Sequence, residues 1–256
     1  MESEGTKEAS LTAQEPSAPA RGAPWSPTSA VLFGLLLTAL LGIGVCQLLQ
    51  PPRVVQGLPD DPAVHAALLM LNGPLLVSAG DLRFETSFDR EAASDLTAPP
   101  TLAADMKRLS DAERWIREGQ QRHRSDPRFE CLLGHLDVAR HRYEMAERHY
   151  ATAVGHASRY GEARLAYGVT LALEAETEGD QRRARALLLR SIGQLAAVDA
   201  RDPFYLPALY DRALLLDRVG RPKDAVAAAR RYLQLEPRSV WSASLMRMIP
   251  GAASSG

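Results

Sequence analysis

The segment from Arg142 to Val154 (RYEMAERHYATAV) places two glutamates, two arginines and a histidine within little more than three helical turns. Carboxylates beside a histidine could serve as a general acid and base, or as metal ligands. On a helix, however, Tyr143 and Tyr150 share one face, while Glu144 and Arg148 form an i,i+4 pair on another. We therefore interpret these charges as the solvent-facing side of a structural helix.

The remaining histidines and cysteines form no recognised reactive pattern. A zinc pair on a helix needs ligands at i,i+4, whereas His141 and His149 are eight residues apart. We expect Cys131 to be a buried, inert thiol, and its distance from Cys46 excludes a disulfide framework. No nucleotide-binding or hydrolase motif is present. The sequence thus predicts a non-enzyme without catalytic, cofactor or metal residues, and with five surface histidines: His123, His135, His141, His149 and His156.

Composition favours helices and argues against a nucleic-acid partner. The 256 residues are 46% hydrophobic but only 6% aromatic, and 30 basic side chains face 31 acidic ones, for a net charge of -1. A near-neutral chain has no global field that attracts nucleic acid. The local basic run 181–190 follows the acidic run 174–180 and lacks interleaved aromatics, so we interpret it as a solvated helix face.

Residues 29–49 (SAVLFGLLLTALLGIGVCQLL) contain no charged side chain. About 20 apolar residues in a helix match the roughly 30 Å hydrocarbon core of a bilayer. We predict an uncleaved transmembrane helix after a disordered tail, 1–28. The alternatives are a buried core helix, a cleaved signal peptide, or a lipoprotein built on Cys46. Arg21 and Arg53 balance each other across the span, and we favour a cytoplasmic tail with the folded body exported.

Residues 50–104 read as a linker with a short helix and a possible strand. Asp61 followed by Pro62 predicts a helix start, and the apolar run that follows is broken by an Asn-Gly-Pro sequence at 72–74. A second membrane span is the alternative for this run. Alternation in LRFETSF (82–88) predicts a brief strand, and TAPPT (97–101) predicts a linker.

Small and large residues recur at fixed spacing in the second half of the chain. One common ruler aligns Gly134 with Ala213 and Ala146 with Ala225. Spacing of this kind resembles the tetratricopeptide repeat, a helix-turn-helix unit of 34 residues. The first unit carries the resemblance at Leu133, Gly134, Tyr143, Ala146, Tyr150 and Ala153, the middle one at Tyr167, Gly168, Ala184, Leu188 and Ile192, and the last at Ala213, Gly220, Ala225, Tyr232 and Pro237.

The resemblance implies an all-α solenoid of three to four repeats over residues 105–237. The middle unit is four residues too long before Ala184, so its first helix is expected to gain a turn. Upstream, Ala112 and Ile116 resemble a second helix that lacks a recognisable first helix. Residues 238–249 are predicted to form a capping helix, and residues 250–256 a disordered end.

In the family, the first helix of each unit lines a concave groove that binds protein partners. The matching positions here are mostly apolar, so the resemblance implies binding of an extended peptide or an amphipathic helix. A charge at Leu165 or Val169 is then expected to abolish partner binding while leaving helicity and melting unchanged. In the alternative interpretation, the chain's own residues 60–100 or its C-terminal helix fill the groove. The predicted groove residues are Cys131, His135, Val138, Leu165, Val169, Ala172, Tyr210, Leu214 and Asp217.

Anchor and repeats together are similar to bacterial envelope proteins that carry an anchored tetratricopeptide domain. The implied function is a scaffold that holds protein partners beside the bilayer during assembly of an envelope complex. The implied location is the inner membrane, with the C-terminal domain periplasmic and residues 29–49 contacting lipid. The alternative is a regulatory or signalling membrane component whose repeats sense a partner.

Overall fold

Helices joined by turns make up the part of the chain that the computed structural model describes, residues 55–71, 79–94 and 106–249. All of these residues lie in one unit, Pro52–Gly256. Within these ranges there is no β-strand, so the predicted all-α class is confirmed. The predicted tail, the predicted span 29–49 and the C-terminal end 250–256 lie outside the described residues. None of the described helices has the length and apolar character needed to cross a bilayer.

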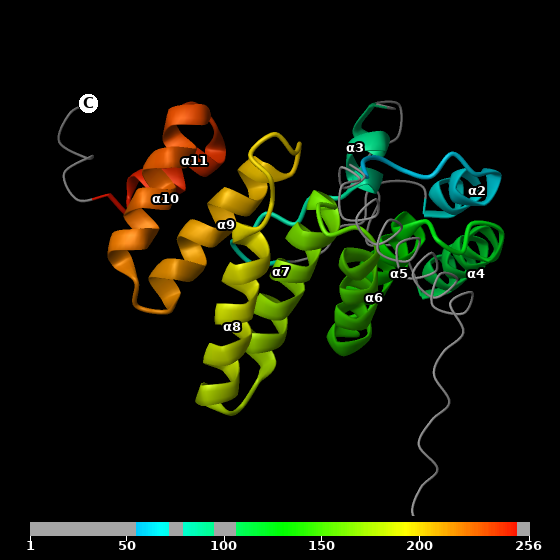
Figure 1. The fold of residues 1–256 in the computed structure, drawn as a ribbon, viewed down its shortest axis with the longest axis horizontal. Coiled ribbons are helices and arrows are strands. Elements are labelled where there is room, and N and C mark those ends of the chain that lie inside the picture. Colours follow the sequence, from blue (N-terminus) through cyan, green and yellow to red (C-terminus); the bar gives the residue numbers. More distant parts are fainter. Residues whose placement is uncertain (1–54, 72–78, 95–105, 250–256) are drawn as a thin grey trace, which may run out of the picture. The chain divides into compact units, whose positions relative to one another are not determined.

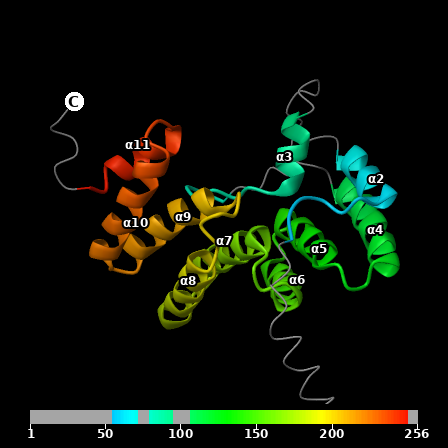
Figure 2. The ribbon, with the colours of Figure 1, turned by 45° about the horizontal axis from the view of Figure 1, so that its top comes forward.

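Three consecutive helix pairs form the body of the array. Each helix packs against the next one along the chain, and Figures 1 and 2 show them side by side. The helix that was expected to gain a turn, α7, has 17 residues, against 13 in α5 and 14 in α9. The pairs are α5 (Pro127–Ala139) with α6 (Tyr143–His156), α7 (Gly161–Thr177) with α8 (Gln181–Ala196), and α9 (Tyr205–Arg218) with α10 (Pro222–Leu235).

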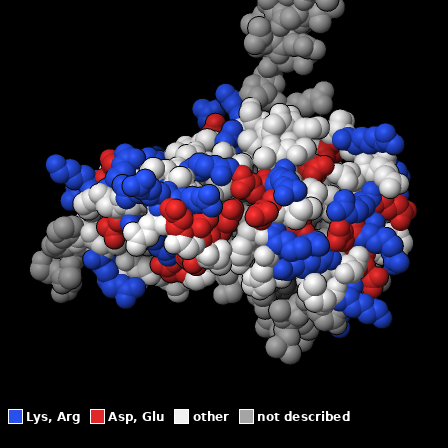
Figure 3. Space-filling view, turned by 90° about the horizontal axis from the view of Figure 1, so that it is seen from below, with Lys and Arg blue, Asp and Glu red and all other residues white. Residues whose placement is uncertain are grey.

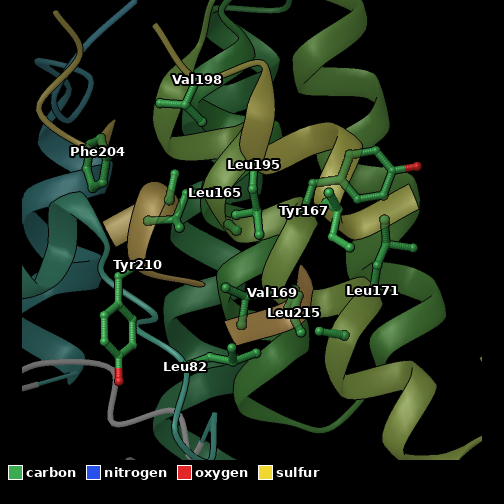
Figure 4. Close-up of a cluster of buried hydrophobic side chains, with 14 of the residues drawn as sticks. Leu82, Leu165, Tyr167, Val169, Leu171, Leu195, Val198, Phe204, Tyr210 and Leu215 are labelled. Atoms are coloured by element: carbon green, nitrogen blue, oxygen red, sulfur yellow. The ribbon is translucent and has the colours of Figure 1, made fainter. Parts of the chain in front are cut away.

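Glycines and alanines lie where paired helices cross. A Cβ on Gly134 would come within 2.5 Å of the Tyr150 ring, and one on Gly168 within 2.7 Å of Leu195. Tyr150 is fully buried in the space that Gly134 leaves open. The predicted pairing of small and large residues therefore sets the close approach of helices within these pairs. Figure 4 shows part of the resulting apolar core.

Helix ends follow local chemistry. The side chain of Asp180 accepts hydrogen bonds from the backbone N–H groups of Arg182 and Arg183, and so caps α8. Gly220 ends the α9 turn with φ 77°, a value that glycine adopts without steric cost. His141 occupies the equivalent turn after α5 with φ 58°. The last unit has Gly220 at this turn, whereas the first unit has His141, so the two turns do not match in the repeat pattern.

An N-terminal helix pairs with α4 (Met106–Arg122), the helix for which the sequence showed no partner. This helix, α2 (Pro62–Leu71), begins at Pro62, where a helix start was predicted. Asp61 accepts from the backbone N–H of Ala63 at 2.7 Å and from Arg122 at 2.7 Å, which ties the start of α2 to the end of α4. The buried apolar residues of this pair form a cluster of their own with α5.

The predicted strand in LRFETSF is wrong. Residues 83–86 are neither helical nor paired with another strand, and Ser87 begins α3 (Ser87–Ser94). The N–H groups of Arg83 and Ser87 bond to carboxylates of distant helices rather than to a neighbouring strand. At the other end of the array, α11 (Val240–Met246) packs on α9 and α10, with the rings of Trp241 and Tyr210 5.1 Å apart.

Candidate functional site

The first helices of the three pairs, α5, α7 and α9, share one face, which we call the helix-A face. Residues 79–90, which we call the strap, lie on it. Ala79 and Leu82 belong to the same apolar cluster as residues of α5, α7 and α9, and Phe88 is fully buried. Figure 2 shows the strap running from α9 toward α3, and Figure 4 shows Leu82 among the core residues of this face. The chain thus covers its own helix-A face.

All nine predicted groove residues lie on α5, α7 or α9, yet only Asp217 is exposed and Leu214 half-buried. This arrangement matches the alternative in which the chain's own residues 60–100 fill the groove. Leu165 and Val169 have no exposed surface. The expectation that a charge there would leave melting unchanged is therefore wrong, since burying an unpaired charge destabilises the fold strongly. The seven buried residues are Cys131, His135, Val138, Leu165, Val169, Ala172 and Tyr210.

One anchor of the strap is the carboxylate of Glu162, at the start of α7. It accepts hydrogen bonds from the backbone N–H of Ser87 at 2.5 Å and from the Ser87 hydroxyl at 2.5 Å. Tyr160 donates to the same carboxylate at 3.1 Å, and Nε2 of His135 lies 3.0 Å from it. With a relative exposure of 1%, Glu162 is a buried carboxylate with four close polar contacts.

His135 links this anchor to α6 and to the aromatic residues of the strap. Its Nδ1 lies 2.8 Å from the Tyr150 hydroxyl, and the rings of Phe84 and Phe88 pack edge-on against its imidazole. Cys131 Sγ lies 3.5 Å from Nε2. His135 has no exposed surface, so its prediction as a surface histidine is wrong. Its position one turn after Cys131 on an apolar helix was the signal that could have revealed this.

Burial and hydrogen bonding set the protonation of this cluster. Burial alone would raise the pKa of Glu162, but the donors on His135 and Ser87 outweigh it and lower that pKa below its ordinary value. Burial raises the pKa of the Cys131 thiol, and those of the Tyr150 and Tyr160 hydroxyls, well above their ordinary values. Cys131 is therefore a protonated, poorly nucleophilic thiol at neutral pH in the metal-free protein, in keeping with the inert thiol predicted from the sequence.

The second anchor is Asp211 on α9. Its Oδ1 accepts the backbone N–H of Arg83 at 2.7 Å, while its Oδ2 has no hydrogen-bond partner among the described residues. Burial raises the pKa of Asp211 well above its ordinary value, and the N–H and charge of Arg83 only partly offset this. The Arg83 guanidinium donates to the Tyr232 hydroxyl at 2.6 Å and lies 5.1 Å from the centre of the Trp241 ring. Here the strap is held by α9, α10 and α11 together.

Outside the helix-A face, charged side chains pair with others on the same helix or on another helix of the array. Glu144 and Arg148 lie 3.7 Å apart and are largely exposed, as the sequence predicted for this helix. Glu147 differs, because it is half-buried and pairs with Arg190 of α8. His149 contacts Glu130 at 2.7 Å. Figure 3 shows basic and acidic side chains interspersed on the face in view.

The sequence did not reveal the two anchoring contacts of the strap, Arg83 with Asp211 and Ser87 with Glu162. Glu162 resembles an ordinary acidic residue in the first turn of a helix, and Asp211 an ordinary polar residue beside a helix A position. Neither position carries a sequence signal, because the partner of each is more than 70 residues away.

No protein-family model and no curated protein matches the chain. Among solved structures, the chain is similar to a thermophilic TPR protein of Thermus thermophilus, with a TM-score of 0.48 and 18% sequence identity. The similarity covers 56% of this chain and 74% of that one.

Proposed function

We propose that this chain is a membrane-anchored scaffold that binds a peptide or helix of a partner protein on its helix-A face, in the assembly of an envelope complex. One observation carries the proposal: the face already holds the strap, which is non-helical at 83–86 and continues into α3 from Ser87. Two buried carboxylates accept hydrogen bonds from backbone N–H groups of the strap, and the side chains of Leu82 and Phe88 are buried against apolar residues. A surface that holds one segment in this way suits another of the same chemistry.

Because the strap occupies the helix-A face, it limits which part of that face a partner can reach. With Leu82 and Phe88 buried, a partner reaches the floor of the face only when the strap leaves, and otherwise contacts only its exposed edge near Leu214 and Asp217. We infer that partner and strap compete. The apparent affinity of a partner is then reduced by the small fraction of molecules in which the strap is undocked.

A photoreactive residue placed at Asp217, on the edge of the helix-A face, tests the competition in native membranes. Leu189, exposed on α8, is the matched control position. Partner crosslinks are expected at Asp217 and not at Leu189, and Ser87→Ala, which loosens the strap, is expected to raise the yield at Asp217 several-fold. Equal yields at both positions would refute binding on this face, and a yield at Asp217 that Ser87→Ala leaves unchanged would refute competition with the strap.

Membrane anchoring rests on the charge-free residues 29–49 and belongs to the same proposal. In the proposed topology, the anchor lies in a bacterial inner membrane with the repeats on the periplasmic side. The intact chain is expected to stay with membranes after alkaline extraction and to need detergent for release. Recovery of the intact chain in the soluble fraction would remove the anchor from the proposal.

A sensing or regulatory role for the same face is the second candidate, and the strap is the observation that favours it. A segment held by two anchors has a docked and an undocked state, and a partner that binds only the undocked state shifts the balance between them. Co-purification with a transcription or signalling factor would favour this role. Co-purification with secretion, pilus or cell-wall machinery would favour the scaffold.

A further inference from the structure

Three potential metal ligands converge beneath the strap. A thiol, an imidazole nitrogen and a carboxylate oxygen, from Cys131, His135 and Glu162, lie within 4.8 Å of one another. Cys131 and His135 are one turn apart on α5, at the i,i+4 spacing that points two ligands the same way. Glu162 reaches them from the start of α7, and all three side chains are buried.

The proton positions allow two states of this cluster. In one, Tyr150 donates to Nδ1 of His135, and Nε2–H donates to Glu162 across 3.0 Å. In the other, Nδ1–H donates to the Tyr150 hydroxyl, and the lone pair of Nε2 faces the carboxylate oxygen and the sulfur. While the thiol keeps its proton, it can donate to Nε2. Once the thiol is deprotonated, three electron-rich atoms face one another in a buried site, and a cation between them would stabilise that arrangement.

We propose that the second state binds a zinc ion through Cys131 Sγ, His135 Nε2 and Glu162 Oε1. Sulfur, imidazole nitrogen and carboxylate oxygen are the ligands that zinc prefers, at about 2.3, 2.0 and 2.0 Å. The Sγ to Nε2 separation of 3.5 Å suits two ligands of one tetrahedral ion. The Nε2 to Oε1 separation of 3.0 Å requires a shift of a few tenths of an ångström. A water or the Tyr160 hydroxyl completes the coordination.

Neighbouring groups already hold these ligands in orientation. Tyr150 fixes the imidazole through Nδ1, as outer hydrogen-bond partners do for zinc-binding histidines. Tyr160 and the Ser87 hydroxyl hold the other carboxylate oxygen, while Oε1, which accepts the backbone N–H of Ser87, keeps a second lone pair for the ion. Zinc at this position would join α5 to α7 and, through Glu162, to the strap. Because all three ligand side chains are buried, the site is structural.

Charge and protons balance on binding. Zinc displaces the thiol proton of Cys131 to solvent, and the neutral imidazole contributes no charge. The thiolate and the carboxylate together neutralise the two positive charges of the ion, so the buried site has no net charge. Affinity should therefore increase as pH rises, because each bound ion releases a proton.

Cobalt substitution tests the site in the full-length chain, purified in detergent and stripped of metal. Added Co²⁺ is expected to give a thiolate-to-cobalt charge-transfer band and tetrahedral visible bands that saturate at one ion per chain. Cys131→Ser should remove the charge-transfer band. The matched control Cys46→Ser, which alters the other cysteine, should keep it.

A milder variant covers the case in which Cys131→Ser does not fold. Tyr150→Phe keeps the ring that packs on Gly134 but removes the partner of Nδ1, and should weaken zinc affinity by about 10- to 100-fold. X-ray absorption of the zinc-loaded wild type should show one sulfur neighbour. Absence of the charge-transfer band in folded wild type, the same band in folded Cys131→Ser, or zinc without a sulfur neighbour would each overturn the proposal.

Discussion

Glu162 and Asp211 both anchor the strap, and their pKa values shift in opposite directions. Each is a buried carboxylate that accepts a backbone N–H of the strap, from Ser87 and Arg83 respectively. Glu162 has three further polar contacts and its pKa is lowered, whereas Asp211 has an unpartnered oxygen among the described residues and its pKa is raised. Burial raises both pKa values, and the hydrogen-bond donors and neighbouring charges decide the sign of the net shift.

The largest effect is expected from Glu162→Gln. An amide has the same shape but no charge, and its NH₂ group must face the donors of Ser87 or Tyr160. Losing one member of a buried hydrogen-bonded pair should lower the free energy of unfolding by about 3–5 kcal/mol. Denaturant titration with a chelator present measures this apart from any bound metal. A loss below about 1 kcal/mol would mean that Glu162 is not the dominant anchor.

Ser87→Ala should cost less, because only the hydroxyl is lost and the backbone N–H still reaches Glu162. We expect a loss of about 1–3 kcal/mol and faster proteolysis within 79–90. Ser110→Ala is the control, since the Ser110 hydroxyl is exposed, donates to a backbone carbonyl within α4 and otherwise accepts only a long bond of 3.4 Å from Arg140. Equal stability of the two variants would contradict the role of the Ser87 hydroxyl.

Arg83→Met keeps an apolar stem and removes the contacts of the guanidinium with Tyr232 and Trp241. The expected loss is about 1–2 kcal/mol, since the backbone N–H bond to Asp211 does not depend on this side chain. Hydrogen exchange of the Arg83 amide should stay slow in the variant. Fast exchange there would show that the guanidinium, rather than Asp211, holds this end of the strap.

Asp211→Asn should have the smallest effect and the opposite sign. Because the folded-state pKa is raised, the contribution of Asp211 to stability is fully present below its unfolded pKa of about 3.9 and is lost as pH rises through the folded value. The amide does not ionise, so the variant should gain about 1 kcal/mol over the wild type at neutral pH, and less in acid. Unfolding free energies measured from acid to neutral pH check this.

The same pH series needs controls for the charged side chains near Asp211. Asp81, Arg83 and Glu85 all face Asp211, so Asp81→Asn and Glu85→Gln are needed as controls for their charges. If Asp211→Asn and wild type differ by the same amount at every pH, Asp211 does not carry the raised pKa.

The helix pairs could be predicted from the sequence because their signal is local and steric. Gly134 with Tyr150 and Gly168 with Leu195 are contacts within a pair, so each repeat carries its own packing code. The strap has no comparable local signal, because its hydrogen-bond partners are not close to it in the sequence. Its alternating LRFETSF pattern predicted a strand, but residues 83–86 pair with no strand and Ser87 begins α3. The carboxylates that bind this segment lie far away in the sequence, so the pattern could not reveal them.

The sequence spacing correctly assigned the predicted groove residues to the first helix of each pair, α5, α7 and α9, and partner binding by these residues stays a prediction. That His135 and Leu165 are buried depends on what covers the face, and the covering residues lie outside the repeat. The pairing of α2 with α4 was missed for the same reason, since the strap separates these helices along the chain.

The contacts of Arg83 also determine when the strap can dock during synthesis of the chain. Its bonding partners, Asp211 and Tyr232, follow it by 128 and 149 residues. During synthesis the strap leaves the ribosome before any helix of its binding face exists, and contacts so distant in sequence form late in folding. Phe88 can be covered once α5 is made, whereas the contacts of Arg83 wait until α10 is complete. In a nascent chain stalled before Tyr232, the strap near Arg83 should be cleaved faster by protease than in the released full chain.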